Sequence, residues 1–149
     1  TVEDWWAENV NPKMREYRDV AMKILNEEDK LKEIVKLLGP EALPDDKKLI
    51  LTTARILKEG FLRQNAYDPI DTYCVIEKQF KALKLIIDFY KNARNTLSRG
   101  VQFDKINSMK IIEKMIRAKE KIANDRLEEY DKLYVEMLKE FEEIAAGAS

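Results

Sequence analysis

The sequence contains no histidine and only one cysteine, Cys74, among its 149 residues. Histidine is the commonest general base and a frequent metal ligand, so its absence removes the usual centres of acid–base and metal chemistry. A single cysteine cannot form an internal disulfide or a multi-cysteine zinc site, and it is typical of a reducing compartment. Because lone cysteines mostly behave as small apolar residues, we expect Cys74 to be buried.

Glycine and proline are also scarce, with four of each, and the glycines are isolated at positions 39, 60, 100 and 147. Isolated glycines form neither a phosphate-binding loop nor a dinucleotide-binding motif. Carboxylates are numerous, but they fall on the polar faces of the expected helices, so no acid–base pair can be singled out. The residues by themselves therefore predict no catalytic site and no metal site.

Long apolar runs and an excess of one charge are missing as well. No run is long enough to span a membrane, and no signal-peptide pattern opens the chain. The net charge is −1 although 37% of the residues are charged, so neither nucleic-acid binding nor direct membrane insertion is predicted. The chain opens at Thr1 without an initiator methionine, and we expect it to be a piece of a longer protein.

Helix-forming residues dominate what is present, and this composition predicts an all-α fold. Apolar residues recur at three- and four-residue steps, which is the period of an amphipathic helix. The pattern predicts a helical bundle of about five to six helices in one domain, residues 1–149. The expected helices are 2–10, 13–38 with a kink or restart at 26–29, 46–60, 74–98, 108–121 and 124–145.

An acidic turn over residues 39–46 separates the second and third of these helices. Gly39 suits the left-handed position that ends a helix, and Pro40 cannot continue one. Asp45 is the expected N-cap of the next helix, and Asp104 is expected to cap a short turn further along the chain. The turn fits either a solvated corner or a protruding tip that pushes on a partner.

The stretch from Phe61 to Tyr73 breaks the helical period of both neighbouring helices. Loop formers alternate in it with aromatic residues, whereas a plain surface linker holds fewer aromatics. Four consecutive residues combine two amides, a small side chain and an aromatic ring that together fit the edge of a flat ligand: Gln64, Asn65, Ala66 and Tyr67. The alternative is a helix connection whose aromatic rings fill the core.

An apolar stripe marks the last expected helix, with Glu128 and Lys132 placed to support it as an ion pair. Its members are Leu127, Tyr130, Tyr134, Met137, Phe141 and Ile144. Such a stripe usually packs against the same chain, and three heptads are too few to indicate a coiled coil.

Several segments, read together, resemble one known family. They are Leu31–Leu43, Phe61–Cys74, Trp5–Val10, Tyr17–Ala21 and Glu77–Gln79. They resemble the C-terminal helical domain of the catalytic A subunit of archaeal A-type and V-type ATP synthases. The resemblance is specific over about residues 4–100 and weak after Arg117. Residues 1–117 are therefore interpreted as family-like and 118–149 as a variable C-terminal helix.

The resemblance implies two functional stretches. In the family, the segment that corresponds to Gln64–Tyr67 forms one side of the adenine pocket, often with Phe in place of Tyr67, and a phenol ring can stack on a purine. The layout is also similar to the C-terminal domain of the F-type beta subunit, whose acidic tip meets the rotating stalk. The corresponding residues here are Gly39, Pro40, Glu41, Ala42, Leu43, Pro44, Asp45 and Asp46. These residues are less acidic than the tip of the F-type beta subunit. The difference favours a contact with the stalk that depends on shape over one that depends on charge.

The resemblance further implies a lever domain that couples ATP synthesis or hydrolysis to stalk rotation and ion transport. The implied cofactors are ATP or ADP with Mg²⁺ in the full-length protein, whose preceding domain carries the phosphate loop, the catalytic glutamate and the magnesium ligands. We expect this chain alone to be inactive and to bind ATP weakly or not at all. The implied partners are B subunits in an alternating A3B3 hexamer, the central stalk and the upstream nucleotide-binding domain, at the cytoplasmic face of the cell membrane.

Two other interpretations stay open. A free-standing helical adaptor would bind a partner helix through the stripe of residues 127–144 and would not need the stretch 64–73. The non-catalytic B subunit of the same hexamer is the second interpretation, although Trp5, Trp6 and the segment 64–68 favour the catalytic one.

Overall fold

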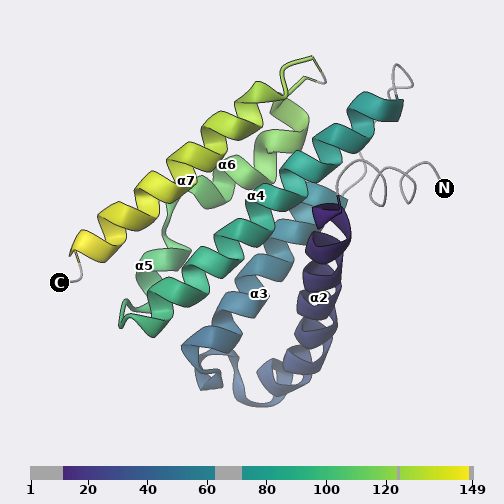
Figure 1. Ribbon diagram of the computed structural model, residues 1–149. Helices are drawn as coiled ribbons and strands as arrows, with labels where there is room; N and C mark the ends of the chain where they lie inside the picture. The colour runs from purple at the N-terminus through teal and green to yellow at the C-terminus, as the bar shows by residue number, and fades with distance from the viewer. Residues whose placement is uncertain (1–11, 63–71, 124, 148–149) are drawn as a thin grey trace.

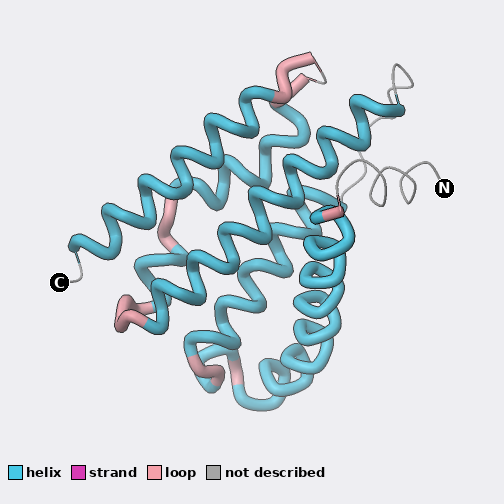
Figure 2. Tube along the Cα trace, viewed as in Figure 1, coloured by secondary structure: helices cyan, strands magenta, loops and turns pink. Residues whose placement is uncertain are grey.

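Helices form every regular element in the part of the chain that the computed structural model describes, which is residues 12–62, 72–123 and 125–147 (Figures 1 and 2). They are α2 (Lys13–Leu38), the 3₁₀ helix η1 (Pro40–Ala42), α3 (Asp45–Leu57), the π-helix η2 (Lys58–Leu62), α4 (Thr72–Ser98), α5 (Phe103–Asn107), α6 (Lys110–Lys121) and α7 (Glu128–Gly147). The all-α prediction is confirmed. The helix predicted at 2–10 lies outside the described residues.

Helix α4 is the centre of the bundle. Figure 1 shows it between α7 on one side and α3 on the other, and it packs against α2, α3, α6 and α7. Leu83 and Ile87 are fully inaccessible to solvent, and Leu85, Ile86 and Phe89 are buried as well. Burial on more than one face follows from the neighbours that α4 has on several sides.

Helix α2 runs without interruption from Lys13 to Leu38, so the predicted restart at Asn26–Asp29 is wrong. Glu28 lies in this segment and is buried. Its carboxylate accepts a hydrogen bond from Lys58 Nζ at 2.8 Å and lies 3.8 Å from Lys32 Nζ. The bond to Glu28 raises the pKa of Lys58. Tertiary pairing of Glu28 thus favours a continuous helix over the local capping preference of Asn and Asp.

Helix α7 packs against α4 and α6 of the same chain. Tyr130, Met137 and Phe141 of the predicted stripe are buried. The carboxylate of Glu140 accepts hydrogen bonds from the backbone N–H groups of Lys110 at 2.7 Å and Ile111 at 3.0 Å. These are the first amides of α6, which lack partners within their own helix. The stripe therefore packs within the bundle. The adaptor interpretation needs the same residues to be exposed for a partner helix, so it is not favoured.

The ion pair expected from Lys132 forms with a different residue. Lys132 Nζ lies 3.1 Å from Glu129 Oε1, three residues earlier, and not against Glu128. Both spacings place two side chains on one helix face, so the pattern alone does not distinguish them.

Asp88 joins three helices of the bundle. Its carboxylate accepts hydrogen bonds from Tyr17 of α2 and Tyr134 of α7. Burial, together with the charge of Asp88, raises the pKa of Tyr17 to about 12. Burial, followed by the hydrogen bond to Asp88, raises the pKa of Tyr134. Asp88 therefore links α2, α4 and α7 through hydrogen bonds to two neutral phenols.

Candidate functional site

The tip, residues Gly39–Asp46, lies between α2 and α3 at the lower end of the bundle in Figure 1. Gly39 has a positive φ of 83°, but its ψ of 160° lies outside the predicted left-handed helical region. Its N–H donates to the carbonyl of Val35 at 2.8 Å. Pro40 then starts the 3₁₀ helix η1. Leu43 is buried, whereas Glu41, Ala42, Pro44 and the two aspartates are exposed. The tip is thus a protruding corner that one leucine anchors to the core.

Asp45 does not cap α3. It is the first residue of that helix, and Pro44 holds the N-cap position without a side-chain hydrogen bond. The Asp45 carboxylate instead accepts the backbone N–H of Phe103 at 3.2 Å, at the start of α5. Asp104, the predicted cap there, lies inside α5, and Gln102 holds the N-cap position. Both capping predictions are wrong. At α5 an aspartate from a remote segment supplies the acceptor, and α3 begins without a side-chain cap.

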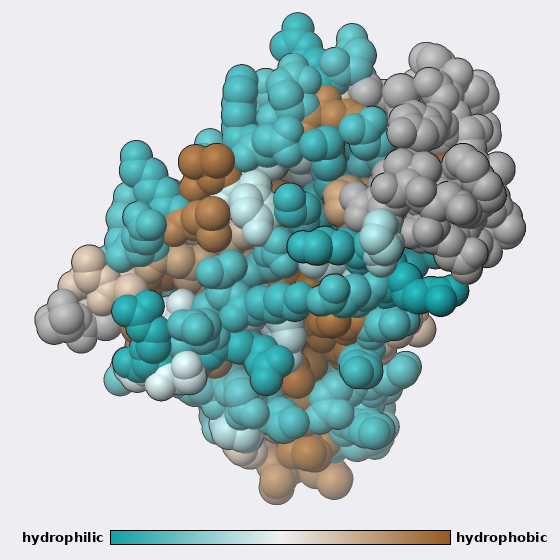
Figure 3. Space-filling view, in the orientation of Figure 1, coloured by the Kyte–Doolittle hydropathy of each residue, from teal (hydrophilic) through white to brown (hydrophobic). Residues whose placement is uncertain are grey.

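An apolar edge borders the tip. Leu37 is 83% exposed and Leu38 is 71% exposed, at the last turn of α2. Figure 3 shows a hydrophobic patch at the lower end of the molecule, where α2 ends in Figure 1. The charges nearby are partly engaged, since Glu41 lies 3.8 Å from Lys48 and Lys47 lies 3.1 Å from Glu27. The exposed surface at this end is therefore more apolar than the acidic sequence indicates.

Helices α3 and η2 connect the tip to the stretch that begins after Leu62. The 13 residues of α3 pass directly into the five residues of η2. At about 1.5 Å per residue this continuous helical segment spans roughly 27 Å. The helical segment is described as far as Leu62, two residues beyond the predicted end at 60, and its last turn is a π-helix that the pattern did not predict. Such turns often occur at functional positions.

Gly60 lets η2 approach α6 closely. A Cβ atom at Gly60 would lie 2.9 Å from the carbonyl oxygen of Met115 and 3.2 Å from the Cα atom of Ile116. Both are backbone atoms of α6, which cannot move without shifting that helix. The backbone contact explains why a glycine stands inside an otherwise helical pattern.

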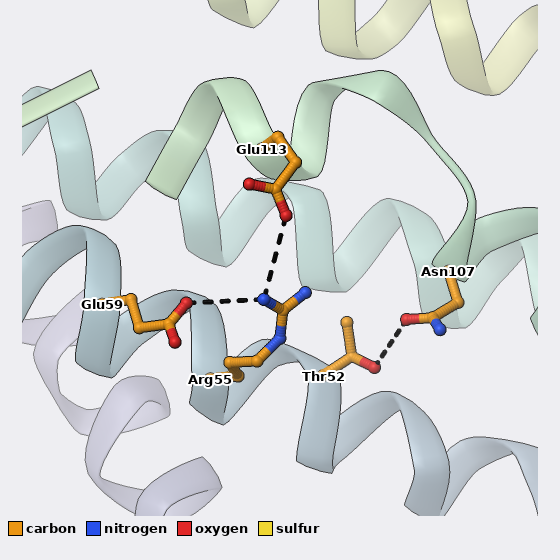
Figure 4. A network of polar contacts seen from close by, with 5 residues as sticks. All are labelled: Thr52, Arg55, Glu59, Asn107 and Glu113. Carbon is orange, nitrogen blue, oxygen red and sulfur yellow. Dashed lines mark hydrogen bonds and ion pairs between the residues drawn. The ribbon is translucent and has the colours of Figure 1, made fainter. Parts of the chain in front are cut away.

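A polar network lies beside this contact (Figure 4). Arg55 of α3 lies 3.4 Å from Glu59 of η2 and 3.9 Å from Glu113 of α6. Thr52 donates to Asn107 Oδ1 at 3.0 Å. The Arg55 pairs are about half exposed, so each contributes at most about 1 kcal/mol. These ion pairs therefore add little to the contact between η2 and α6.

The predicted adenine-facing residues Gln64, Asn65, Ala66 and Tyr67 lie outside the described residues. The structure describes the helices on either side of them, η2 and α4. Cys74 lies in the first turn of α4, and its predicted burial falls outside the described side chains.

No metal centre is indicated among residues 12–62, 72–123 and 125–147, where no group of three or more Cys, Asp or Glu side chains is placed to hold an ion. In the same part of the chain, no helix is long and apolar enough to cross a membrane.

Comparisons with known proteins identify the family. Residues 3–107 match the family model described as the C-terminal domain of V and A type ATP synthase. This chain belongs to that family. The match includes the tip and the stretch 61–73, and it ends before α6.

Similar proteins are named as the A subunit of A-type ATP synthase. The one from Ignicoccus hospitalis is 45% identical over 147 residues, which are 97% of this chain. Those from Hyperthermus butylicus and Saccharolobus islandicus are 46% and 43% identical, over 97% and 99% of this chain. The chain covers 24–25% of the length of these relatives. The family and the names of the relatives favour the catalytic A subunit over the adaptor and over the non-catalytic B subunit.

Proposed function

We propose that this chain is the lever domain of the catalytic A subunit of an A-type ATP synthase. The observation that supports the proposal most directly is the single helical segment of α3 and η2, which joins the tip at 39–46 to the stretch after Leu62. In the proposal, Gln64–Tyr67 line the adenine side of the nucleotide site. The tip, with the adjoining Leu37 and Leu38, meets the rotating stalk.

The mechanism couples these two ends. Rotation of the stalk pushes the tip and tilts α3, which changes how closely the adenine wall approaches the nucleotide. Coupling free energy is reciprocal for binding, so tighter nucleotide binding also biases the position of the lever. This coupling requires that the tip make different contacts with the stalk in the open and closed states of the nucleotide site. Ring stacking on Tyr67 would supply part of the difference in nucleotide affinity.

The remaining parts of the active complex belong to other domains and subunits in this proposal. The phosphates and Mg²⁺ bind to the upstream nucleotide-binding domain, and this chain alone is inactive. B subunits complete an alternating A3B3 hexamer around the central stalk. The complex couples ATP synthesis or hydrolysis to ion transport at the cytoplasmic face of the membrane.

Replacing Tyr67 with Ala in the intact complex tests the adenine wall. Loss of a ring stacked on the base is expected to raise the KM for ATP about tenfold, equivalent to about 1.4 kcal/mol, with little change in kcat. Tyr67→Phe keeps the ring and is the matched control, with a KM within about twofold of the wild type. Unchanged KM and kcat in Tyr67→Ala would remove this residue from the nucleotide site.

Removing charge from the tip tests how it meets the stalk. Glu41→Ala with Asp46→Ala is expected to leave the torque of the rotating complex nearly intact, because both side chains are exposed and the neighbouring surface is apolar. Asp45 is left unchanged, since its carboxylate holds the first amide of α5. Single-molecule rotation under load is the measurement. A large loss of torque in the double variant would show that charge drives the contact.

A further inference from the structure

Two lysines link the ends of three helices. Lys119 of α6 donates from Nζ to the carbonyl of Phe61 in η2 at 3.0 Å. Lys78 of α4 donates from Nζ to the carbonyl of Lys119 at 3.1 Å, and also to the carbonyl of Ile122. These contacts form a continuous chain from η2 through the end of α6 to α4. We call Lys78 and Lys119 the lysine clasp.

Each lysine donates to a carbonyl on another helix. Phe61 lies in the last described turn of η2, while Lys119 and Ile122 stand at the C-terminal end of α6. At the end of α6, the negative end of the helix dipole favours a cation. Burial lowers the pKa of both lysines, and the charge of Lys119 lowers that of Lys78 further. The two ammonium groups thus replace lost hydration with bonds to backbone carbonyls, and such charge-assisted bonds are the stronger class.

The clasp joins the two helices that border the stretch 63–71. Phe61 lies in η2, the helix that precedes residues 63–71. Lys78 lies in the second turn of α4, the helix that follows them. The connecting residues, Lys119 and Ile122, lie beyond residue 107, where the family match ends. Gly60 brings η2 against α6 at the same junction. The end of α6 therefore connects the helices on either side of the proposed adenine wall, which also contact each other directly.

We propose that Lys78 and Lys119 are positioning residues, which tie η2 to α4 through the end of α6 and so hold the two ends of the adenine wall in place. The proposal rests on the function proposed above and assigns to α6 a role in nucleotide affinity. Neither lysine touches the nucleotide. Both act by fixing the helices from which the wall extends.

The test uses Lys119→Met and Lys78→Met in the intact complex, with steady-state hydrolysis of ATP and GTP. Methionine keeps much of the apolar stem and removes the ammonium donor. A loosened wall is expected to raise the KM for ATP roughly threefold to tenfold and to reduce the preference for ATP over GTP, with kcat within about twofold. Lys121→Met changes an exposed lysine of the same helix and is expected to behave as the wild type. The double variant should be no worse than the more affected single variant, because the two lysines form one chain.

A purely structural role gives a different result. If the lysines only stabilised the domain, the amount of active complex and the apparent kcat would fall while the KM stayed unchanged, and the proposal would be overturned. Lys119→Arg retains a cationic donor and is expected to recover most of the ATP affinity. It also provides a folded variant if Lys119→Met does not assemble.

Comparison with Tyr67→Ala separates this proposal from the one on which it rests. A raised KM in Tyr67→Ala and in both clasp variants supports both. A raised KM in Tyr67→Ala with wild-type values in the clasp variants overturns the clasp and leaves the adenine wall standing. A raised KM in the clasp variants alone shows that the clasp does not act through this wall, and it overturns the clasp proposal. If the KM is unchanged in every variant, both proposals are overturned.

Discussion

Phe89→Ala is expected to lower the free energy of unfolding by about 3–5 kcal/mol, the largest effect of any single substitution considered for this chain. Phe89 is fully buried at the centre of α4, and its ring lies 5.5 Å from the ring of Phe141 in α7. Truncation removes the buried ring and leaves a cavity that the surrounding helices fill only partly. Urea unfolding of the 149-residue chain, followed by circular dichroism, measures the effect.

Val135→Ala is the matched control for this substitution. Val135 lies in α7 but is 65% exposed, so its truncation is expected to change stability by no more than about 0.5 kcal/mol. If Phe89→Ala cost less than about 1 kcal/mol, α7 would not be packed on α4 as the structure has it. The apolar stripe of α7 would then again be available to a partner, as the adaptor interpretation requires.

Gly60→Ala is expected to destabilise the chain by about 1–3 kcal/mol, although alanine favours a helix over glycine by up to about 1 kcal/mol. The added methyl group would meet the Met115 carbonyl at 2.9 Å, so η2 and α6 must separate. The separation also lengthens the bond from Lys119 to Phe61. In the intact complex we therefore expect a raised KM for ATP as well as a lower melting temperature.

Gly147→Ala provides the comparison, because no atom lies within 4 Å of a Cβ placed at that position. Helix propensity then acts alone, and stability is expected to stay equal or rise slightly. If Gly60→Ala were as stable as Gly147→Ala, the close approach of η2 to α6 would be contradicted, and with it the physical basis of the clasp.

Periodicity predicted most of the helices because their buried faces repeat along the local sequence. The second expected helix, 13–38, matches α2, and the helix end at Gly39 follows from the freedom of glycine to adopt positive φ. The π-helix was not predicted, and neither was the contact that its Gly60 makes with Met115 and Ile116, which lie far along the chain in α6. Local pattern carries no information about such a contact.

The same limit explains what was missed at the candidate site. Asp45 has the pattern of a local cap, but its partner is an amide 58 residues away. Lys78 and Lys119 have the pattern of ordinary charges on helix surfaces, because the carbonyls that they bind lie on other elements. The stretch 64–67 is predicted from the reverse signal, a break in helical period that combines amides with an aromatic ring, together with the family resemblance, and it stays a prediction.

Photolabelling with 2-azido-ATP in the intact complex tests the central claim most directly, because the reactive group sits on the adenine ring. After illumination and proteolysis, the labelled peptides are sequenced by mass spectrometry. We expect label within Gln64–Tyr67, and we expect excess ATP to prevent it. Label found only on other peptides, with none in residues 61–73, would contradict the adenine wall and the lever mechanism built on it.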